Sequence, residues 1–456
     1  MNIPVIPADV PAEKRIEWLT KNLDKFCVLP WLNLNTNPNG NIKLCCNIQI
    51  DHWVSDGVPY NLGKHDIDVI WYSHYMKNAR KMHRSNLGSV ECADCYNMEK
   101  VSGHSPRVGQ NDMWTERQAD DKSLEKYLKD VSSEEPLIRP KQLPTSLELR
   151  LGNKCNLKCI TCWGMSSSLI HEERTEYLKN NLLDVPALKW LEADWENEKQ
   201  LVDNTDVSEW FETDIFYNNF KKMAPTLKRL YTTGGEPTVI KANYKMLQFL
   251  LEAGNDTCRI EFTSNMTNWN PLFYDNLSKF KNVEIQMSID GVDEIGEYIR
   301  YPSNFSKVRE NLFKAVEIAS RNPGWKIKCY TVLQALNYKH LAPIWNLLNE
   351  AGVKYNKSID WWPITLYSPS FLSLACVPLE IRKECIPTLI KESELFKNSN
   401  DGRFYLSEGT LGACKDSILN MEYQPTLQER FDAYIIFTDK QRSANSQKIN
   451  FVKKNG

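Results

Sequence analysis

Short apolar runs rich in β-branched residues alternate with longer segments of helical periodicity along most of the chain. The short runs predict six strands, at 146–151, 227–233, 258–264, 283–289, 326–333 and 358–364. The longer segments predict helices near 166–182, 242–253, 271–280, 304–321, 338–351 and 378–396. Such alternation is typical of an α/β fold built from βα units around a parallel sheet. Six units indicate an open or partial TIM-like (β/α)6 barrel, not a closed barrel of eight strands.

Composition narrows the class of protein. The chain has 456 residues, of which 42% are hydrophobic and 25% charged, and its net charge is -2. This is the composition of a folded globular protein, and the small net charge gives no electrostatic argument for binding nucleic acid. No apolar run reaches the roughly 18 residues that a membrane span needs. The first residues lack a basic and then apolar signal sequence, so a cytoplasmic location is expected.

Thirteen cysteines in such a compartment are expected to be thiols rather than disulfides, and metal binding is their main special use. The clustered ones are informative. Cys155, Cys159 and Cys162 follow the first predicted strand with the spacing C-x3-C-x2-C. A complete zinc or iron–sulfur shell takes four ligands, so three local thiolates imply either a distant fourth ligand or an iron left open for another molecule.

This loop resembles that of the radical SAM superfamily, in which three such cysteines hold a 4Fe-4S cluster. The resemblance implies that the fourth iron chelates the amino and carboxylate groups of S-adenosylmethionine. Family members often have an aromatic residue before the last cysteine, whereas Thr161 stands there in this chain and Trp163 follows it.

The ends of the predicted strands carry further candidates for the same site, because parallel α/β folds build their sites at the carboxyl ends of strands. Gly234-Gly235-Glu236-Pro237 follows the second strand and is similar to the family's motif for the methionyl amino group. The glycines allow close backbone approach, and Glu236 offers an acceptor for an ammonium. A tight turn is the structural alternative.

Polar residues also end the third and fourth strands, namely Ser264, Asn265, Ser288 and Asp290. Similar pairs in the family bind the cofactor's ribose, although turn formation or helix capping would also explain them. Arg300 matches an arginine that similar enzymes direct at the cofactor carboxylate, and a surface salt bridge is its competing role. Gln334 and Asn337 follow the fifth strand and are expected near the same cleft.

A second group of cysteines precedes the predicted barrel. Two strands are predicted around a Pro-Asn-Gly turn, with Cys27 before them and Cys45 and Cys46 after them, and Cys92 and Cys95 form a C-x2-C pair. The spacing C-x12-G-x4-C resembles the opening of SPASM and twitch domains, which hold an auxiliary cluster. That resemblance implies a second 4Fe-4S cluster on Cys27, Cys45, Cys92 and Cys95, with Cys46 spare. A structural zinc site would be satisfied equally well by two thiolate pairs.

The expected organisation is a cluster domain with a β-hairpin at 1–100, a connector at 101–145, the barrel at 146–400 and an extension at 401–456 that forms a helix or two. An acidic segment at 184–214 with interleaved tryptophans is expected to be a solvated helical face, or else a lid over a basic substrate.

The resemblance implies an enzyme that cleaves S-adenosylmethionine reductively and abstracts hydrogen from a peptide, protein or small molecule. A flavodoxin- or ferredoxin-like protein would supply the electron. The alternative is a non-catalytic zinc or iron–sulfur metalloprotein.

Overall fold

The structure is a computed structural model, which describes residues 6–7, 9–11, 14–48, 57–120, 142–207, 209–391 and 408–442. Its strands are β1 (Asn33–Thr36), β2 (Ile42–Lys43), β3 (Ser146–Arg150), β4 (Arg229–Thr233), β5 (Arg259–Ser264), β6 (Val283–Ser288), β7 (Trp325–Leu333) and β8 (Ile359–Thr365). The pairs β1–β3, β5–β6, β6–β7 and β7–β8 are parallel, and β1–β2 is antiparallel. The predicted α/β class is therefore confirmed, and β3 to β8 lie where the six strands are predicted.

The chain divides into two compact units, which are taken separately. The first consists of Met1–Gly152, Val207–Thr232 and Lys245–Cys258, and the second of Asn153–Asp206, Thr233–Tyr244 and Arg259–Gly456. The cysteines of the early group lie in the first unit and the C-x3-C-x2-C loop in the second. The expected domain boundaries at 100, 145 and 400 stay a prediction.

In the first unit the strand order is β2-β1-β3-β4. Its helices are α1 (Arg15–Asn22), α2 (Leu29–Leu32), α3 (Ile67–Trp71), α4 (His74–Arg84), α5 (Ala93–Ser102), α6 (Pro106–Asp120), α10 (Asp214–Met223) and most of α11 (Lys241–Glu252), with the short 3-10 turn η2 (Val90–Cys92). The predicted hairpin forms at the expected turn, where Gly40 has φ +83 and a Cβ would lie 2.5 Å from the Trp210 ring. Trp210, from the acidic segment, is thus a core residue of this unit.

Two features of the first unit differ from the expectation. The short helix α2 separates Cys27 from β1, so Cys27 does not stand at a strand end. The expected connector contains the long helix α6, whose Asn111 and Trp114 are buried. A buried asparagine breaks the apolar pattern by which a packed helix is identified, which explains why sequence patterning misses α6.

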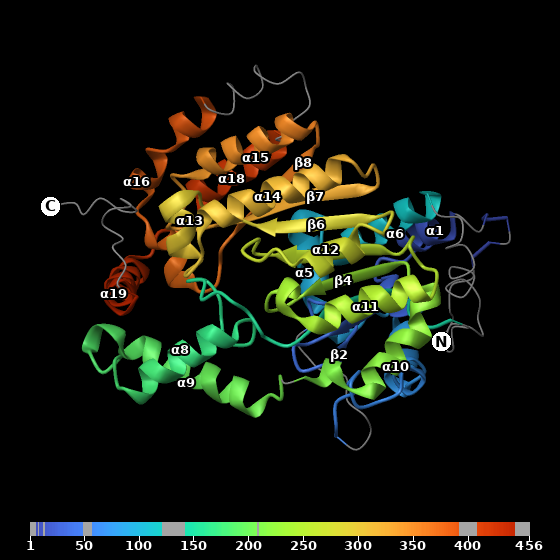
Figure 1. The fold of residues 1–456 in the computed structure, drawn as a ribbon. Coiled ribbons are helices and arrows are strands. Elements are labelled where there is room, and N and C mark those ends of the chain that lie inside the picture. Colours follow the sequence, from blue (N-terminus) through green and yellow to red (C-terminus); the bar gives the residue numbers. More distant parts are fainter. Residues whose placement is uncertain are drawn as a thin grey trace. The chain divides into compact units, whose positions relative to one another are not determined.

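In the second unit the strand order is β5-β6-β7-β8. Its helices are α8 (Ser168–Lys179), α9 (Lys189–Asn204), α12 (Pro271–Leu277), α13 (Asp293–Ile299), α14 (Phe305–Ser320), α15 (Leu341–Tyr355), α16 (Leu379–Lys383), α18 (Glu408–Asn420) and α19 (Pro425–Gln441), with the turn η7 (Pro237–Val239). Helices α14 and α15 pack along β7 and β8 (Figure 1). Alternate residues of β7, from Trp325 to Leu333, are buried toward these helices, which is the period of a half-covered strand.

The acidic segment and the tail are helical. Helix α9 buries Trp195 against Tyr177 and Phe437, while Asp194 and Glu196 are exposed. This matches the expected solvated helical face with one buried side. The tail forms α18 and α19, the expected helix or two.

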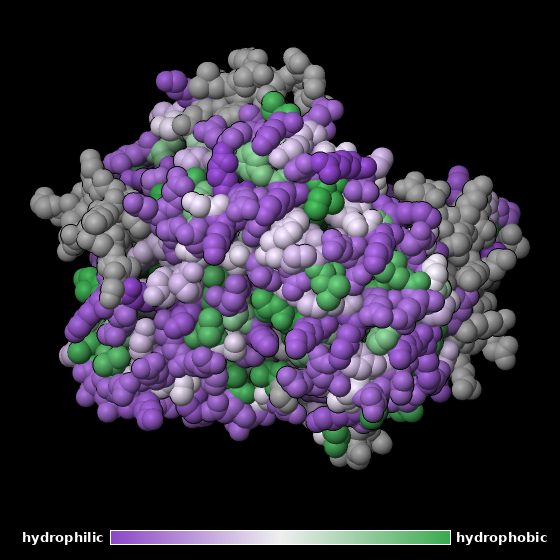
Figure 2. Space-filling view, viewed as in Figure 1, coloured by the Kyte–Doolittle hydropathy of each residue, from purple (hydrophilic) through white to green (hydrophobic). Residues whose placement is uncertain are grey.

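Figure 2 shows a mostly hydrophilic surface on the face drawn, with small scattered apolar areas. Within the described ranges, no helix is long and apolar enough to cross a membrane. The cytoplasmic location stays a prediction.

Candidate functional site

The loop that carries Cys155, Cys159 and Cys162 is closed at its base by hydrogen bonds. Ser168 N–H donates to the Asn153 carbonyl at 2.7 Å, and Asn153 Nδ2 donates to the Gly164 carbonyl at 2.8 Å. Ser167 Oγ, the N-cap of α8, donates to the Leu157 carbonyl at 2.7 Å. All three thiols are half-buried. The loop is therefore held in shape by its own backbone and by the start of α8.

The Gly-Gly-Glu turn after β4 touches this loop through backbone atoms. Glu236 N–H donates to the Lys154 carbonyl at 2.9 Å. Gly235 has φ +57, and a Cβ there would lie 2.2 Å from that carbonyl oxygen. No residue with a side chain fits at this position without moving the cysteine loop, which explains the second glycine of the motif.

The end of β5 is joined to the same loop by side chains. Asn265 Nδ2 donates to Asn156 Oδ1 at 2.9 Å, and Asn156 Nδ2 donates to Thr267 Oγ1 at 2.8 Å. Asn156 stands next to Cys155 in the chain. Sequence reasoning identifies Asn265 as a cofactor contact, whereas this structure gives it a role in fixing the cysteine loop.

A third attachment comes from the end of α13. Lys158 N–H donates to the Tyr301 carbonyl at 2.5 Å, and Ile160 N–H donates to the Ile299 carbonyl at 2.8 Å. These two bonds lie on either side of Cys159 in the cysteine loop and on either side of Arg300 in the segment after α13. The structure therefore brings the backbone around Arg300 to the cysteine loop.

The Glu236 carboxylate is buried and accepts four hydrogen bonds. Oε1 accepts from Thr238 N–H at 3.1 Å, from Thr238 Oγ1 at 2.7 Å and from Ser264 Oγ at 2.9 Å, and Oε2 accepts from Asn265 N–H at 2.7 Å. Burial raises the pKa of Glu236, and these donors oppose that rise. Oε1 is saturated, so only Oε2 keeps a lone pair for a ligand. Pro237 is buried and begins η7 directly after this carboxylate.

Asp290, after β6, is paired with Arg300 instead of pointing freely into a cleft. Its Oδ2 lies 2.7 Å from Arg300 Nη2, and its Oδ1 accepts from Val332 N–H at 2.7 Å. Asn337 Nδ2 donates to the Asp290 carbonyl at 2.9 Å, so Asn337 fixes the backbone of Asp290. Arg300 thus forms the salt bridge expected as its competing role, but the pair is buried and not at the surface, because Asp290 is 1% exposed.

Arg300 keeps donors for a further partner. Burial alone would lower the pKa of its guanidinium, but Asp290 and Cys159 act against this and the pKa is raised. Its Nε–H is buried and has no hydrogen-bond partner in the part of the chain that the structure describes. A buried unpaired guanidinium N–H is costly unless a ligand completes it, and a carboxylate is its natural acceptor.

Helices α8 and α9 each add one residue that sequence reasoning missed. Arg174 Nη2 donates to the Cys162 carbonyl at 2.8 Å, and Arg174 Nη1 pairs with the Glu198 carboxylate at 2.6 Å. Glu198 Oε1 also accepts from Gly164 N–H at 3.0 Å. The pair thus braces the last cysteine from outside the loop. No local pattern announces either residue, since both stand in ordinary helical sequence.

The loop thiols are neutral without a metal. Burial raises the pKa of Cys155 to about 12 and that of Cys162 to about 12, with neighbouring thiols adding to the shift. A metal binds the thiolate, so loading this loop must displace protons.

The early cysteines meet at one cavity of the first unit. Its lining includes Cys27, Cys45, Cys46, Cys92 and Cys95. Burial raises the pKa of Cys45 to about 11, and the thiols of Cys92 and Cys95 add to that shift. Burial raises the pKa of Cys46 to about 12, and there the Glu148 carboxylate adds to it. Cys45 is the less exposed of the two adjacent thiols.

Among the described residues, no three His, Cys, Asp or Glu side chains converge on a point that would hold one metal ion. Cysteine thiolates are ligands of iron–sulfur clusters and of structural zinc alike.

Comparisons with known proteins identify neither a family nor a relative for this chain: no family model matches, and no curated protein matches. Among solved structures, AdoMet-bound anSMEcpe is 16% identical to this chain with a TM-score of 0.33. The matched region covers 56% of this chain and 62% of the anSMEcpe chain. Streptococcus suis SuiB bound to S-adenosylmethionine has 13% identity and a TM-score of 0.32, covering 68% of this chain and 65% of its own. This chain thus spans less than two thirds of either protein. Likeness at this level does not establish an activity.

Proposed function

We propose that this chain is a radical SAM enzyme whose Cys155, Cys159 and Cys162 hold a 4Fe-4S cluster that binds S-adenosylmethionine. One observation carries the proposal. The cysteine loop is bonded to the Gly-Gly-Glu turn on one side and to the segment around Arg300 on the other, and Arg300 keeps a buried, open N–H. A purely structural thiol site needs neither neighbour.

A 4Fe-4S cluster held by Cys155, Cys159 and Cys162 would supply the electron for reductive cleavage of S-adenosylmethionine to methionine and a 5′-deoxyadenosyl radical, the species that would abstract hydrogen from the substrate. An external one-electron reductant of the flavodoxin or ferredoxin type replaces the electron. The protein's part is to bind, orient and shield these groups.

The chain's own residues divide the cofactor between them in this proposal. Arg300 takes the methionyl carboxylate through its open Nε–H, and Oε2 of Glu236 takes the ammonium. Gly234 and Gly235 let the turn approach closely enough for that contact. Ser288, at the end of β6, is the remaining candidate for the ribose. Ser264 and Asn265 act through Glu236 and the cysteine loop.

We further propose a second 4Fe-4S cluster on Cys27, Cys45, Cys92 and Cys95, in a twitch-like region at the N-terminus. The shared cavity of these thiols supports it. Cys45 is preferred to Cys46 because it matches the C-x12-G-x4-C spacing from Cys27, and it is the less exposed of the two.

The proposed fold of the second unit is the partial barrel of this superfamily. The proposed substrate is a peptide or protein. It is supported by the side of β7 and β8 that faces away from α14 and α15. Tyr330 and Trp362 are neighbours there by register, followed by Val332 and Ile364, and the β8 members are about half exposed. Such a strip suits an aromatic or aliphatic side chain better than a polar small molecule.

The test is anaerobic reconstitution followed by dithionite and S-adenosylmethionine, with 5′-deoxyadenosine as the readout. We expect product from the wild-type chain and none from a Cys155→Ala, Cys159→Ala, Cys162→Ala variant. Two cubanes would bring about eight iron and eight sulfide per chain. About four iron plus one zinc would instead assign the early site to zinc. A chain that holds iron but makes no 5′-deoxyadenosine, and binds no S-adenosylmethionine, would be the non-catalytic metalloprotein.

A further inference from the structure

The backbone on both sides of Cys27 is held by side chains of helix α6. The Phe26 carbonyl accepts from Asn111 Nδ2 at 3.0 Å and from Arg107 Nη1, and Val28 N–H donates to Asn111 Oδ1 at 3.0 Å. Asn111 is 3% exposed and Arg107 8%. Both peptide groups next to Cys27 are therefore fixed by one buried amide, with Arg107 adding a charged donor to the first.

Helix α4 holds the adjoining backbone. His83 Nδ1–H donates to the Lys25 carbonyl at 2.9 Å, and Arg80 Nε donates to the Pro30 carbonyl at 2.9 Å. The backbone hydrogen-bonding groups of this segment are thus paired with side chains, whereas in a helix or sheet they would pair with other backbone groups. Such an arrangement fixes the backbone position of Cys27, and it requires several polar side chains to be buried.

Arg107 also connects this segment to the helix of two other thiols. Its Nε donates to Glu99 Oε1 at 2.9 Å, and its Nη2 donates to Glu99 Oε2 at 2.5 Å. Glu99 belongs to α5, which carries Cys95 and begins directly after Cys92. One guanidinium therefore joins the Cys27 backbone to the Cys92 and Cys95 helix, and it lines the thiol cavity as well.

We propose that Asn111 and Arg107 are positioning residues for the auxiliary cluster: Asn111 sets the place of Cys27, and Arg107 fixes Cys27 relative to the helix of Cys92 and Cys95. The inference rests on the proposed second cluster. Arg107 also lines the thiol cavity with a positive charge paired to Glu99. Its removal would leave the Glu99 carboxylate unpaired, which disfavours the more negative, reduced state of a cluster held there.

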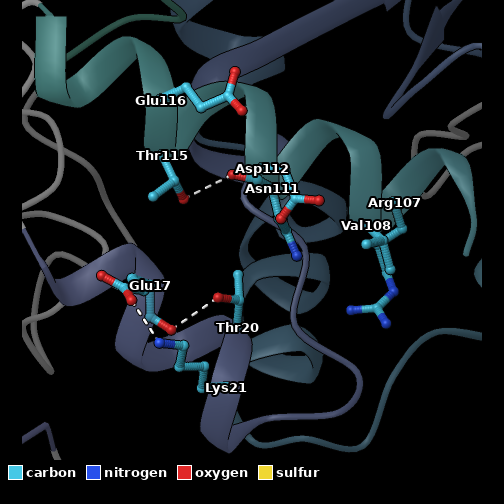
Figure 3. A pocket seen from close by; sticks show the side chains of 9 residues that line it. All are labelled: Glu17, Thr20, Lys21, Arg107, Val108, Asn111, Asp112, Thr115 and Glu116. Carbon is cyan, nitrogen blue, oxygen red and sulfur yellow. Dashed lines mark hydrogen bonds and ion pairs between the residues drawn. The ribbon is translucent and has the colours of Figure 1, made fainter. Parts of the chain in front are cut away.

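Figure 3 shows why a matched control is available on the same helix. Arg107 and Asn111 extend from one side of α6 in this view, whereas Glu116 lies alongside another turn of the same helix, away from them. All three line the cavity of about 450 Å³ between α1 and α6. Glu116→Gln changes one charge on α6 without touching the bonds around Cys27.

The experiment uses the full chain with Cys155, Cys159 and Cys162 replaced by alanine, so that only the early site can hold a cluster. Into it are placed Cys27→Ala, Asn111→Leu, Asn111→Asp, Arg107→Gln, Arg107→Lys and Glu116→Gln. Iron and sulfide are counted after anaerobic reconstitution. The rate of iron loss to a chelator and the cluster's reduction potential are then measured, and circular dichroism checks folding.

We expect Asn111→Leu to lose iron about tenfold faster than Glu116→Gln, approaching Cys27→Ala, and its oxidised form to show the electron paramagnetic resonance signal of a cluster that has lost one iron. Asn111→Asp keeps the acceptor for Val28 N–H and should be intermediate, which separates positioning from misfolding. Arg107→Gln should lower the reduction potential, whereas Arg107→Lys should keep it nearer the parent value while still speeding iron loss.

The outcomes separate the two proposals. A parent chain that takes up no cluster removes the second cluster from the proposed function, and this inference with it. A cluster that depends on Cys27 but is lost at parental rates from folded Asn111→Leu, Asn111→Asp and Arg107→Gln variants overturns the inference and leaves the proposed function standing.

Discussion

Replacing Glu236 by glutamine separates the charge of this side chain from its shape. The amide oxygen can occupy the place of Oε1 and keep the three bonds from Thr238 and Ser264. The amide nitrogen then replaces Oε2, which lies 2.7 Å from Asn265 N. Two donors face each other there, so the Asn265 N–H is left buried without an acceptor.

The magnitude follows from these contacts. An unsatisfied buried donor costs about 1–3 kcal/mol, and bonds to a neutral amide are weaker than bonds to a carboxylate. The glutamine is spared the desolvation that raises the Glu236 pKa, which offsets part of this. We expect a net loss of about 2 kcal/mol in the free energy of unfolding of the metal-free chain. Urea midpoints measure it, with exposed Glu294→Gln as the control.

Ligand affinity gives the sharper readout. Oε2 is the only oxygen with spare capacity, and its charged bond to the ligand's ammonium is worth about 1.5–3 kcal/mol. At 1.4 kcal/mol per tenfold, the dissociation constant for S-adenosylmethionine should rise about 10- to 100-fold. Equilibrium dialysis on the oxidised, reconstituted protein measures it without turnover. Unchanged affinity at equal iron content would refute the assignment of the ammonium to Glu236.

Thr238→Val separates bracing from binding. It removes the hydroxyl donor to Oε1 but leaves Oε2 and Asn265 N–H in place. We expect about 1 kcal/mol of destabilisation and less than about a threefold change in affinity. A larger loss of affinity than in Glu236→Gln would mean that Glu236 acts only through the shape of the turn.

Three further predictions concern other residues. Burial would raise the pKa of Glu99, but its bonds to Arg107 and Ser105 outweigh burial and hold that pKa below 4.5. The charged carboxylate therefore stabilises the fold above pH 4.5, and this contribution is lost as the pH falls through the pKa of Glu99 in the folded chain. Glu99→Gln should cost about 1 kcal/mol of unfolding free energy at pH 7, measured by urea midpoints, and nothing once the wild-type carboxylate is protonated. Because Cys155 and Cys162 have pKa values near 12, loading the loop should release about three protons, as measured by titration calorimetry in two buffers of different ionisation enthalpy. Arg174→Gln should lower the free energy of unfolding by about 3 kcal/mol, because it leaves the Glu198 carboxylate buried without its partner. The double variant with Glu198→Gln should lose less. If thermal unfolding shows that the two single losses add, the residues are not coupled.

The fold that sequence patterning recovers is the part encoded by local periodicity. β3 to β8 fall at the predicted positions because short apolar runs mark buried strands, whether burial alternates, as in β7, or is nearly continuous, as in β6. The parallel pairing of Asn33 with Ser146 joins segments more than a hundred residues apart, and no local pattern encodes it. Helix α6 was hidden for a related reason, since its buried face uses Arg107 and Asn111 to bond distant backbone.

The site shows the same division. Motif spacing identifies Glu236 and Arg300, which the structure brings to the cysteine loop. It does not identify Thr238 or Glu198, because their role depends on hydrogen bonds formed only in the folded chain. Nor does it reveal that Asp290 bonds to Val332 N–H, since every residue but proline has a backbone donor and the sequence gives no sign of which one is used.

The Asp290–Arg300 pair changes what the two residues can do for a ligand. Sequence resemblance assigns them separately, one to a ribose and the other to a carboxylate. In the structure Oδ1 of Asp290 accepts from Val332 N–H and Oδ2 is ion-paired with Arg300 without meeting a hydrogen-bond donor among the described residues, whereas Arg300 keeps its Nε–H. Asp290 therefore serves to hold the guanidinium charged and in place. A ligand carboxylate would then meet a donor already fixed in place. The cost of removing the guanidinium from water has already been offset in the folded chain by its pairing with Asp290. Under this condition a buried arginine gives both affinity and selectivity.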